Sequence, residues 1–110
     1  MPSAILRGLG RLAIAAAISF CLGSTPVRAE EIQVTIDNFT FAPAEVKVKV
    51  GDTVTWTNHD DIPHTVVSAG KFRSKTLDTD NAFSFTFTTA GDYKYFCSLH
   101  PHMTGMIKVE

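Results

Sequence analysis

The chain has 110 residues, of which 45% are hydrophobic and 19% charged, and its formal net charge is −1. This length accommodates one domain. The charge is too close to neutral, and the basic residues are too scattered, for a nucleic-acid-binding surface. Two cysteines cannot form a disulfide-rich scaffold, and the apolar content is not that of a disordered chain.

Residues 1–29 have the pattern of a cleaved export signal. Arg7 and Arg11 precede an uncharged apolar run over 12–22, and small residues then lead to Ala29, after which we expect cleavage. The run is too short for a membrane span of about 20 residues. A bulky residue before Cys21 argues against a lipid anchor at that position. We therefore expect export to the periplasm and no membrane span in the mature chain.

The mature chain, residues 30–110, would carry seven Lys/Arg against eleven Asp/Glu, a formal net charge of −4. Because Cys21 leaves with the signal, no disulfide can form within the mature chain. Cys97 is then a lone thiol in an oxidising compartment, where an unprotected thiol is a liability. We expect a bound group to occupy it.

Short strands dominate the mature chain. Apolar and polar residues alternate with a period of two, and turn pairs such as Gly51-Asp52 and Gly91-Asp92 separate the alternating segments. The expected strands are 32–36, 46–50, 54–56, 65–68, 83–87, 93–97 and 106–110. Residues 71–81 are polar and irregular, which predicts a loop or a weak edge strand. Strands at this spacing are typical of a small all-β antiparallel sandwich, here a single domain.

Side chains that bind metals gather in two segments. Cys97, His100 and Met103 have the spacing C-x2-H-x2-M just after an expected strand, and His64 begins an expected strand 33 residues before Cys97. A thiolate, two imidazoles and a thioether are the ligand set of a blue-copper electron-transfer site. Soft sulfur favours Cu(I) and imidazole also suits Cu(II), so the set serves both oxidation states. It leaves no open position for a substrate.

Each of these residues also has a simpler interpretation. A single Cys is often a small buried hydrophobe, and Met often fills gaps in loops. A lone His64 would more often be a surface or core histidine, and Asn58 could be a turn residue. The coincidence of all these features favours a metal site.

The mature chain resembles the cupredoxins, and within them the amicyanin type. Methionine follows His100 by three residues, whereas plastocyanin and pseudoazurin place it five residues after, where this chain has Gly105. The motifs that carry the resemblance are Asn-Phe-Thr-Phe-x-Pro at 38–43, Val-Gly-Asp-x-Val at 50–54, Trp-x-Asn at 56–58, Pro63-His64, Gly-x-Tyr-x-Tyr-x-Cys at 91–97 and Met-x-Gly at 103–105.

The resemblance implies a Greek-key sandwich that holds one type 1 copper ion. The implied ligands are His64, Cys97, His100 and, as the weak axial ligand, Met103. Asn58 and Pro63 would support the ligands, with Asn58 tying the His64 loop to the Cys97 loop by hydrogen bonds. His102 stands where an apolar aromatic residue is expected, and we interpret His59 and His102 as exposed loop residues.

The expected function is single-electron transfer by Cu(II)/Cu(I) cycling, without enzyme activity. Electrons would pass through the edge of His100, surrounded by apolar Ile62, Leu99 and Pro101. Asp60 and Asp61 would steer a basic partner toward this surface. The resemblance implies transient redox partners such as a dehydrogenase or a c-type cytochrome, and we expect a monomer.

Two other functions share some of these features. A copper storage or delivery module would use the same ligands, although the methionine-rich tracts expected of such a carrier are missing from this sequence. A copper oxidase or nitrite reductase would need further histidines beside the cysteine. Cys97 is instead flanked by Phe96 and Ser98, and the chain is too short for a second domain.

Overall fold

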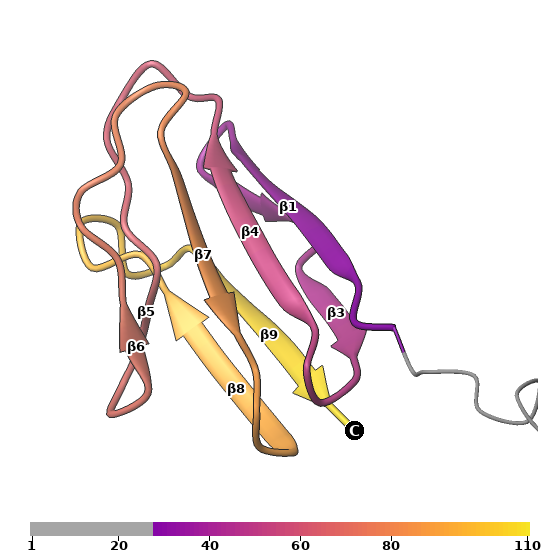
Figure 1. The fold of residues 1–110 in the computed structure, drawn as a ribbon. Helices are drawn as coiled ribbons and strands as arrows, with labels where there is room; N and C mark the ends of the chain where they lie inside the picture. Colours follow the sequence, from indigo (N-terminus) through magenta and orange to yellow (C-terminus); the bar gives the residue numbers. More distant parts are fainter. Residues whose placement is uncertain (1–27) are drawn as a thin grey trace, which may run out of the picture.

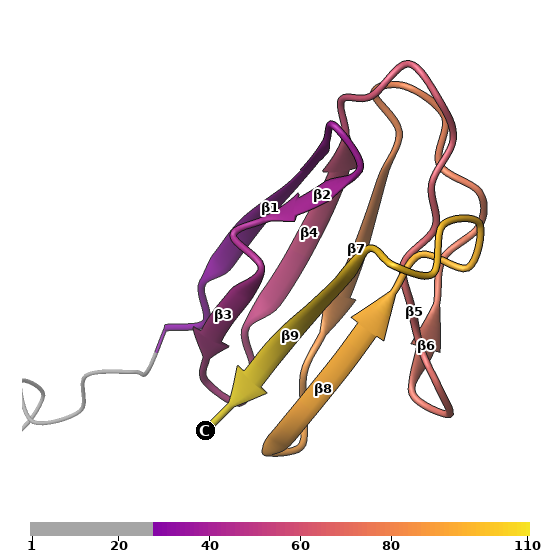
Figure 2. The same ribbon diagram turned by 180° about the vertical axis from the view of Figure 1, so that it is seen from behind.

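Two β-sheets face each other across a layer of apolar side chains (Figure 1, Figure 2). The computed structural model describes residues 28–110, so the expected export signal lies outside the described residues except for its last two positions. The strands are β1 (Glu31–Asp37), β2 (Thr40–Ala42), β3 (Glu45–Val48), β4 (Thr53–Asn58), β5 (Val67–Ser68), β6 (Phe72–Arg73), β7 (Ala82–Thr86), β8 (Gly91–Phe96) and β9 (Thr104–Val109). Over this described range the chain contains no helix that could span a membrane.

The predicted β-sandwich is confirmed, with two strands beyond those expected. One sheet has the order β2-β1-β4-β7 and the other β3-β9-β8-β5-β6. β6 is an edge strand within 71–81, where the sequence predicts a loop or a weak edge strand. β2 pairs with the end of β1. It has only three residues, too few to show a clear apolar–polar alternation in the sequence.

Two of the strand pairings run parallel. β1 pairs in parallel with β4, and β3 with β9, whereas the other pairings are antiparallel. The sandwich is therefore mixed rather than purely antiparallel. Alternation indicates which face of a sheet a side chain occupies but carries no information on the direction of the neighbouring strand.

Aromatic side chains from both sheets fill the centre of the sandwich. Trp56 of β4 is fully buried, and its ring centroid lies 5.4 Å from that of Tyr95, in the opposite sheet. Phe72 and Phe83 lie 5.6 and 5.7 Å from the Trp56 ring. Burying aromatic rings of this size is a major part of the hydrophobic stabilisation of so small a domain.

Most side chains face the side that the alternation predicts, and Val50 is an exception. Ile107 and Val109 of β9 are buried as expected. Val50, expected to continue the buried face of β3, is 50% exposed because β3 ends two residues earlier. There the chain turns through Gly51, which has φ 101°, and the Asp52 carboxylate accepts a backbone N–H from within the turn.

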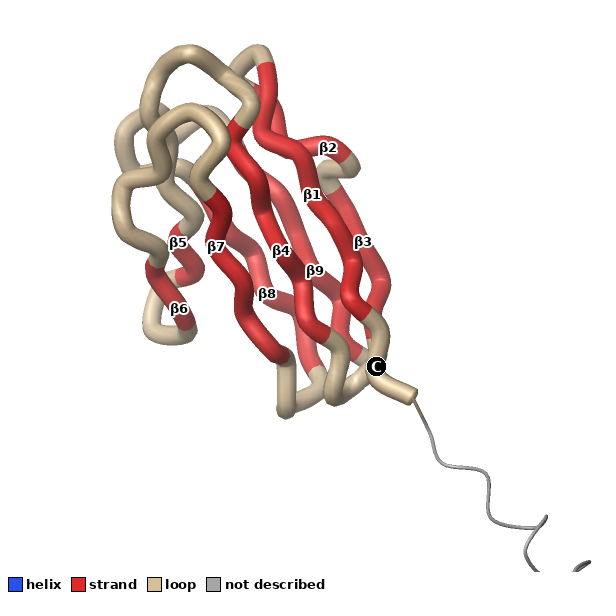
Figure 3. The backbone as a smooth tube through the Cα atoms, turned by 45° about the horizontal axis from the view of Figure 1, so that its top comes forward, coloured by secondary structure: helices blue, strands red, loops and turns tan. Residues whose placement is uncertain are grey.

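The loops that carry the candidate metal ligands gather at one end of the sandwich. Figure 3 shows the connection after β4 and the connection after β8 together at the end remote from the C-terminus. Segments that are distant in the sequence meet there. Functional residues are commonly found on loops that a rigid framework positions in this way.

Candidate metal centre

His64 lies in the connection between β4 and β5 and is fixed by backbone hydrogen bonds. Its N–H donates to the Leu77 carbonyl at 3.1 Å, and the Leu77 N–H donates to the His64 carbonyl at 2.8 Å. Asn58, fully buried at the end of β4, donates through Nδ2 to the carbonyls of Ile62 at 3.0 Å and Leu77 at 2.9 Å. The connection is therefore held in one shape on both sides of His64.

The segment from Cys97 to Met103 forms a loop between β8 and β9 that is closed by its own backbone. The N–H of His100 donates to the Cys97 carbonyl at 3.2 Å, and that of Met103 to the His100 carbonyl at 2.9 Å. The N–H of Cys97 donates in turn to the Met103 carbonyl at 3.1 Å. Paired residues Phe96 and Thr104 close the base of the loop, so the C-x2-H-x2-M spacing folds into a compact turn.

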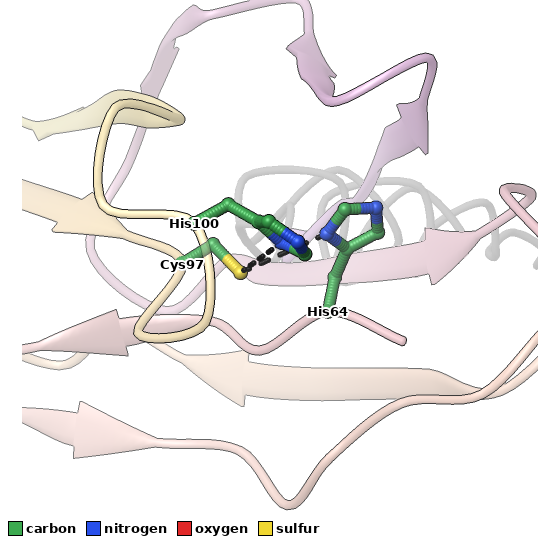
Figure 4. A group of neighbouring side chains, drawn as sticks. All are labelled: His64, Cys97 and His100. Carbon is green, nitrogen blue, oxygen red and sulfur yellow. Dashed lines mark hydrogen bonds between the residues drawn. The ribbon is translucent and has the colours of Figure 1, made fainter. Parts of the chain in front are cut away.

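These two segments bring His64, Cys97 and His100 together (Figure 4). Nδ1 of each histidine lies 3.7 Å from the Cys97 Sγ, and the three ligand atoms are within 4.8 Å of one another. Metal–sulfur and metal–nitrogen bonds of about 2.3 and 2.0 Å, the values for zinc, would separate N and S by about 3.7 Å at an angle near 120°. The spacing thus fits a metal ion bound by all three.

The chemistry of these donors fits copper. A cysteine with two histidines in a trigonal arrangement, and a methionine as a weak axial donor, is the ligand set of blue-copper sites. His64 and Cys97 are fully buried, Met103 is 6% exposed, and His100 is partly exposed. His64, Cys97 and His100 therefore meet at a largely buried point with His100 at its surface edge, and Met103 is buried in the same loop as Cys97 and His100.

The pKa of the Cys97 thiol is lowered by its surroundings. Burial is the largest single influence on its pKa and raises it, but hydrogen bonds outweigh burial and lower the pKa from 9.0 to about 6. Among the hydrogen bonds that lower it, the one from the Thr65 N–H has the largest effect. The thiolate, which is the form that binds metals, is therefore favoured at neutral pH.

Thr65 connects the two ligand segments, a role expected of Asn58. The Thr65 N–H lies 3.4 Å from Cys97 Sγ, and its Oγ1 accepts the Ser98 N–H at 2.8 Å and lies 2.8 Å from Ser98 Oγ. The Asn58 side chain instead bonds to Ile62 and Asp60 in the His64 connection and to Leu77 between β6 and β7. Pro63 is exposed beside His64. The signal available in the sequence is a hydroxyl residue directly after a candidate ligand.

The apolar residues expected to border His100 all reach the surface at least in part. Leu99 is 48% exposed, Pro101 is exposed and Ile62 is partly exposed. Phe39 adds to this surface: it is 50% exposed, and its ring centroid lies 5.1 Å from that of His100. Phe39 is not recognisable from the sequence as part of this surface, because it comes from the β1–β2 turn, far from the ligands in the chain.

The acidic and histidine residues near the site divide into two groups. His59, Asp61 and His102 are exposed, as expected of loop residues. Asp60 is not free to steer a partner, because its side chain is only 11% exposed and accepts a hydrogen bond from His64. Hydrogen bonding, first from the Phe39 N–H and also from His64, lowers the pKa of Asp60 to about 2 against the opposing effect of burial.

Known proteins are similar to this chain in sequence and in fold. The family model for the cupredoxin-like domain matches residues 10–109. Amicyanin of Paracoccus versutus is 36% identical over 95 residues, which cover 81% of this chain and 72% of the relative. A chloroplastic plastocyanin of Tetradesmus obliquus is 33% identical over an alignment of 113 positions, which covers 89% of this chain and 77% of the relative.

Solved structures agree with these sequence relatives. A purple cupredoxin from Nitrosopumilus maritimus superposes with a TM-score of 0.70 at 34% identity, covering 72% of this chain and 99% of that one. A mutant amicyanin in its oxidized state superposes with a TM-score of 0.70 at 38% identity, covering 73% of this chain and 82% of that one. With the ligand geometry and both kinds of similarity in agreement, the chain belongs to the cupredoxin-like domain family.

Proposed function

We propose that this cupredoxin is an electron carrier that cycles one copper ion between Cu(II) and Cu(I). The observation that carries the proposal is the meeting of two imidazole nitrogens with a buried thiol of lowered pKa. We assign His64, Cys97 and His100 as equatorial ligands and Met103 as the weak axial ligand.

Copper, when bound, supplies the one-electron redox step. The residues of the chain contribute a framework that resists rearrangement. The Leu77 N–H donates to the His64 carbonyl, and the Thr65 N–H faces the Cys97 sulfur. Three backbone hydrogen bonds close that loop on itself. Burial of Cys97 and Met103 excludes water from the donors. A ligand set that keeps its shape lowers the barrier to electron transfer.

We assign the partly exposed edge of His100 as the point of electron entry and exit. Ile62, Leu99 and Pro101 border it, and exposed Leu99 and Phe39 make that border apolar. A small apolar patch suits transient redox contacts, which bury less than about 1,200 Å² in total. Partners held by so small a contact separate quickly, as an electron carrier that serves two partners in turn requires.

The compartment and the partners complete the proposal. Cleavage after Ala29 would deliver the domain of residues 30–110 to the periplasm as a monomer. There it would exchange electrons with protein partners, for which a dehydrogenase and a c-type cytochrome are the candidates by family analogy. The saturated ligand set supports a carrier rather than an enzyme, because catalytic metal sites keep a position open for substrate.

The test is the optical and electrochemical behaviour of the mature chain loaded with copper. We expect an intense visible charge-transfer band and a reversible voltammetric wave, both absent in Cys97→Ser and retained in Ser98→Ala, which removes the neighbouring hydroxyl. Ready loss of copper to chelators, without such a wave, would favour storage or delivery instead. Retention of the band in Cys97→Ser would refute the ligand assignment.

A further inference from the structure

Asp60 joins one of the assigned ligands to a distant turn of the backbone. Its Oδ2 lies 2.7 Å from Nε2 of His64 and accepts the Phe39 N–H at 2.9 Å. Its Oδ1 accepts the Asn38 N–H at 2.7 Å. The Asp60 N–H donates to Asn58 Oδ1 at 2.9 Å, which fixes the carboxylate's own backbone. One buried carboxylate thus receives three hydrogen bonds from two separate parts of the fold.

The hydrogen bond to His64 determines how that imidazole is protonated. An ionised carboxylate can only accept, so the proton of the neutral ring must lie on Nε2. Nδ1 is then left with a free lone pair, and this is the nitrogen that faces the Cys97 sulfur at 3.7 Å. Carboxylates that accept from the far nitrogen of a metal-binding histidine fix its tautomer and orientation and raise its basicity.

The hydrogen bonds to the turn hold an aromatic side chain against the site. Asn38 and Phe39 have φ angles of 52° and 58°, a left-handed conformation that is uncommon for residues other than glycine. Asp60 accepts both of their N–H groups and so stabilises this conformation. As a result, the Phe39 ring meets the rings of His64 and His100 edge-on, with centroids 5.6 and 5.1 Å away.

We propose that Asp60 is a positioning residue of the copper site, one that sets the donor strength of His64 and holds Phe39 over both imidazoles. This inference rests on the proposed function, since it takes His64 to be a copper ligand. A more basic imidazole stabilises Cu(II) more than Cu(I), so Asp60 lowers the reduction potential. Loss of its charge therefore raises the potential.

The first experiment compares Asp60→Asn with Asp61→Asn in the copper-loaded mature chain. Both variants remove one negative charge within four residues of His64 in the chain, but Asp61 is exposed and serves as the matched control for the general effect of charge. Losing such a supporting hydrogen bond typically costs about 10-fold or more in metal affinity. A 10-fold weaker affinity confined to Cu(II) corresponds to a rise of about 59 mV for a one-electron couple. We expect this rise in Asp60→Asn beyond any change in Asp61→Asn.

The second experiment needs no copper. In the metal-free protein with neutral imidazoles, nitrogen NMR should find the His64 proton on Nε2 and Nδ1 bare. Hydrogen exchange at the Asn38 and Phe39 amides should be slow in the wild type and in Asp61→Ala, and faster in Asp60→Ala. The wild-type tautomer is measurable even if an Asp60 variant does not fold.

The outcomes separate this inference from the proposed function. A wild-type protein without the visible band and the voltammetric wave would overturn the copper role itself. A blue wild type in which Asp60→Asn and Asp61→Asn have the same potential would overturn only the role of Asp60. A proton on Nδ1 of His64 in the metal-free wild type would overturn it as well.

Discussion

Thr65 offers the sharpest test of how the two ligand segments are held together. Thr65→Val keeps the shape of the side chain and the backbone N–H that faces Cys97, but it removes Oγ1. The Ser98 N–H, which donates to that oxygen at 2.8 Å, then loses its acceptor. The contact between the two hydroxyls is lost at the same time. The hydroxyl also lies 3.8 Å from Cys97 Sγ, so the variant removes a weak contact to the sulfur as well.

The cost follows from the burial of the broken hydrogen bond. Leaving a buried donor unsatisfied costs about 1–3 kcal/mol. Because Ser98 itself is exposed, water can satisfy part of its amide, so we expect the low end, about 1 kcal/mol. In a domain of this size, 1 kcal/mol lowers the melting temperature by about 4–8 °C. Ser98→Ala should cost less, because the N–H still reaches the Thr65 oxygen.

Thermal and urea unfolding of the mature chain give the comparison. Thr76→Val, the same change at an exposed position, is the matched control. The copper-loaded variant should keep its visible band, since the N–H that faces the sulfur is unchanged. Equal melting temperatures for Thr65→Val and Thr76→Val would refute the idea that Thr65 holds the ligand segments together.

Three further substitutions test the axial ligand, the packing under the ligand loop and the response to acid. Met103→Leu should perturb the copper spectrum and raise the reduction potential, by about 59 mV for each 10-fold loss in Cu(II) over Cu(I) affinity, whereas Met106→Leu, at a partly exposed position, should change neither. Gly105→Ala places a methyl group in steric overlap with the hydroxyl end of the Tyr95 side chain and should destabilise the domain by about 1–3 kcal/mol in urea unfolding. Hydrogen bonds from two backbone N–H groups lower the pKa of Asp52, so its contribution to stability is complete above about pH 4 and fades as pH falls through the lower folded-state pKa. Asp52→Asn should therefore be less stable than the wild type at neutral pH, with a difference that shrinks in acid.

Each of these expectations has a clear contrary result. Spectral and potential changes confined to Met106→Leu would transfer the axial position to that residue. Wild-type stability in Gly105→Ala would show that the Tyr95 ring can move aside. A constant difference between Asp52→Asn and the wild type from neutral pH to acid would mean that the carboxylate's ionisation is not linked to folding.

The sequence predicted the features that depend on local pattern. Alternation placed Ile107 on the buried face and Met106 on the other, and the structure confirms both. The C-x2-H-x2-M spacing predicted that Cys97 and His100 would meet in one loop, and they do. Both inferences need only residues that are close in the chain, whose relative positions are limited by backbone geometry.

Features that depend on distant pairing were not predictable in this way. Nothing in the alternation indicates that β9 pairs in parallel with β3, because both directions present the same faces. Phe39 adopts a left-handed conformation that its residue type disfavours. In the sequence Asp60 is recognisable only as an acidic residue near His64, which predicts a place on the partner surface. Only the fold shows that its carboxylate turns inward to a backbone turn more than 20 residues away.

The two histidines of the site differ in ways that suit separate tasks. His64 is fully buried, hydrogen-bonded on both sides of its backbone and bonded through its far nitrogen to Asp60. His100 is partly exposed and belongs to a loop that is closed by its own backbone. Substitutions behind His64 should therefore act on the reduction potential, whereas substitutions around the exposed edge of His100, such as at Leu99, should act on the encounter with partners. A carrier gains from this separation, because its partner surface can change without altering the energy of the electron it carries.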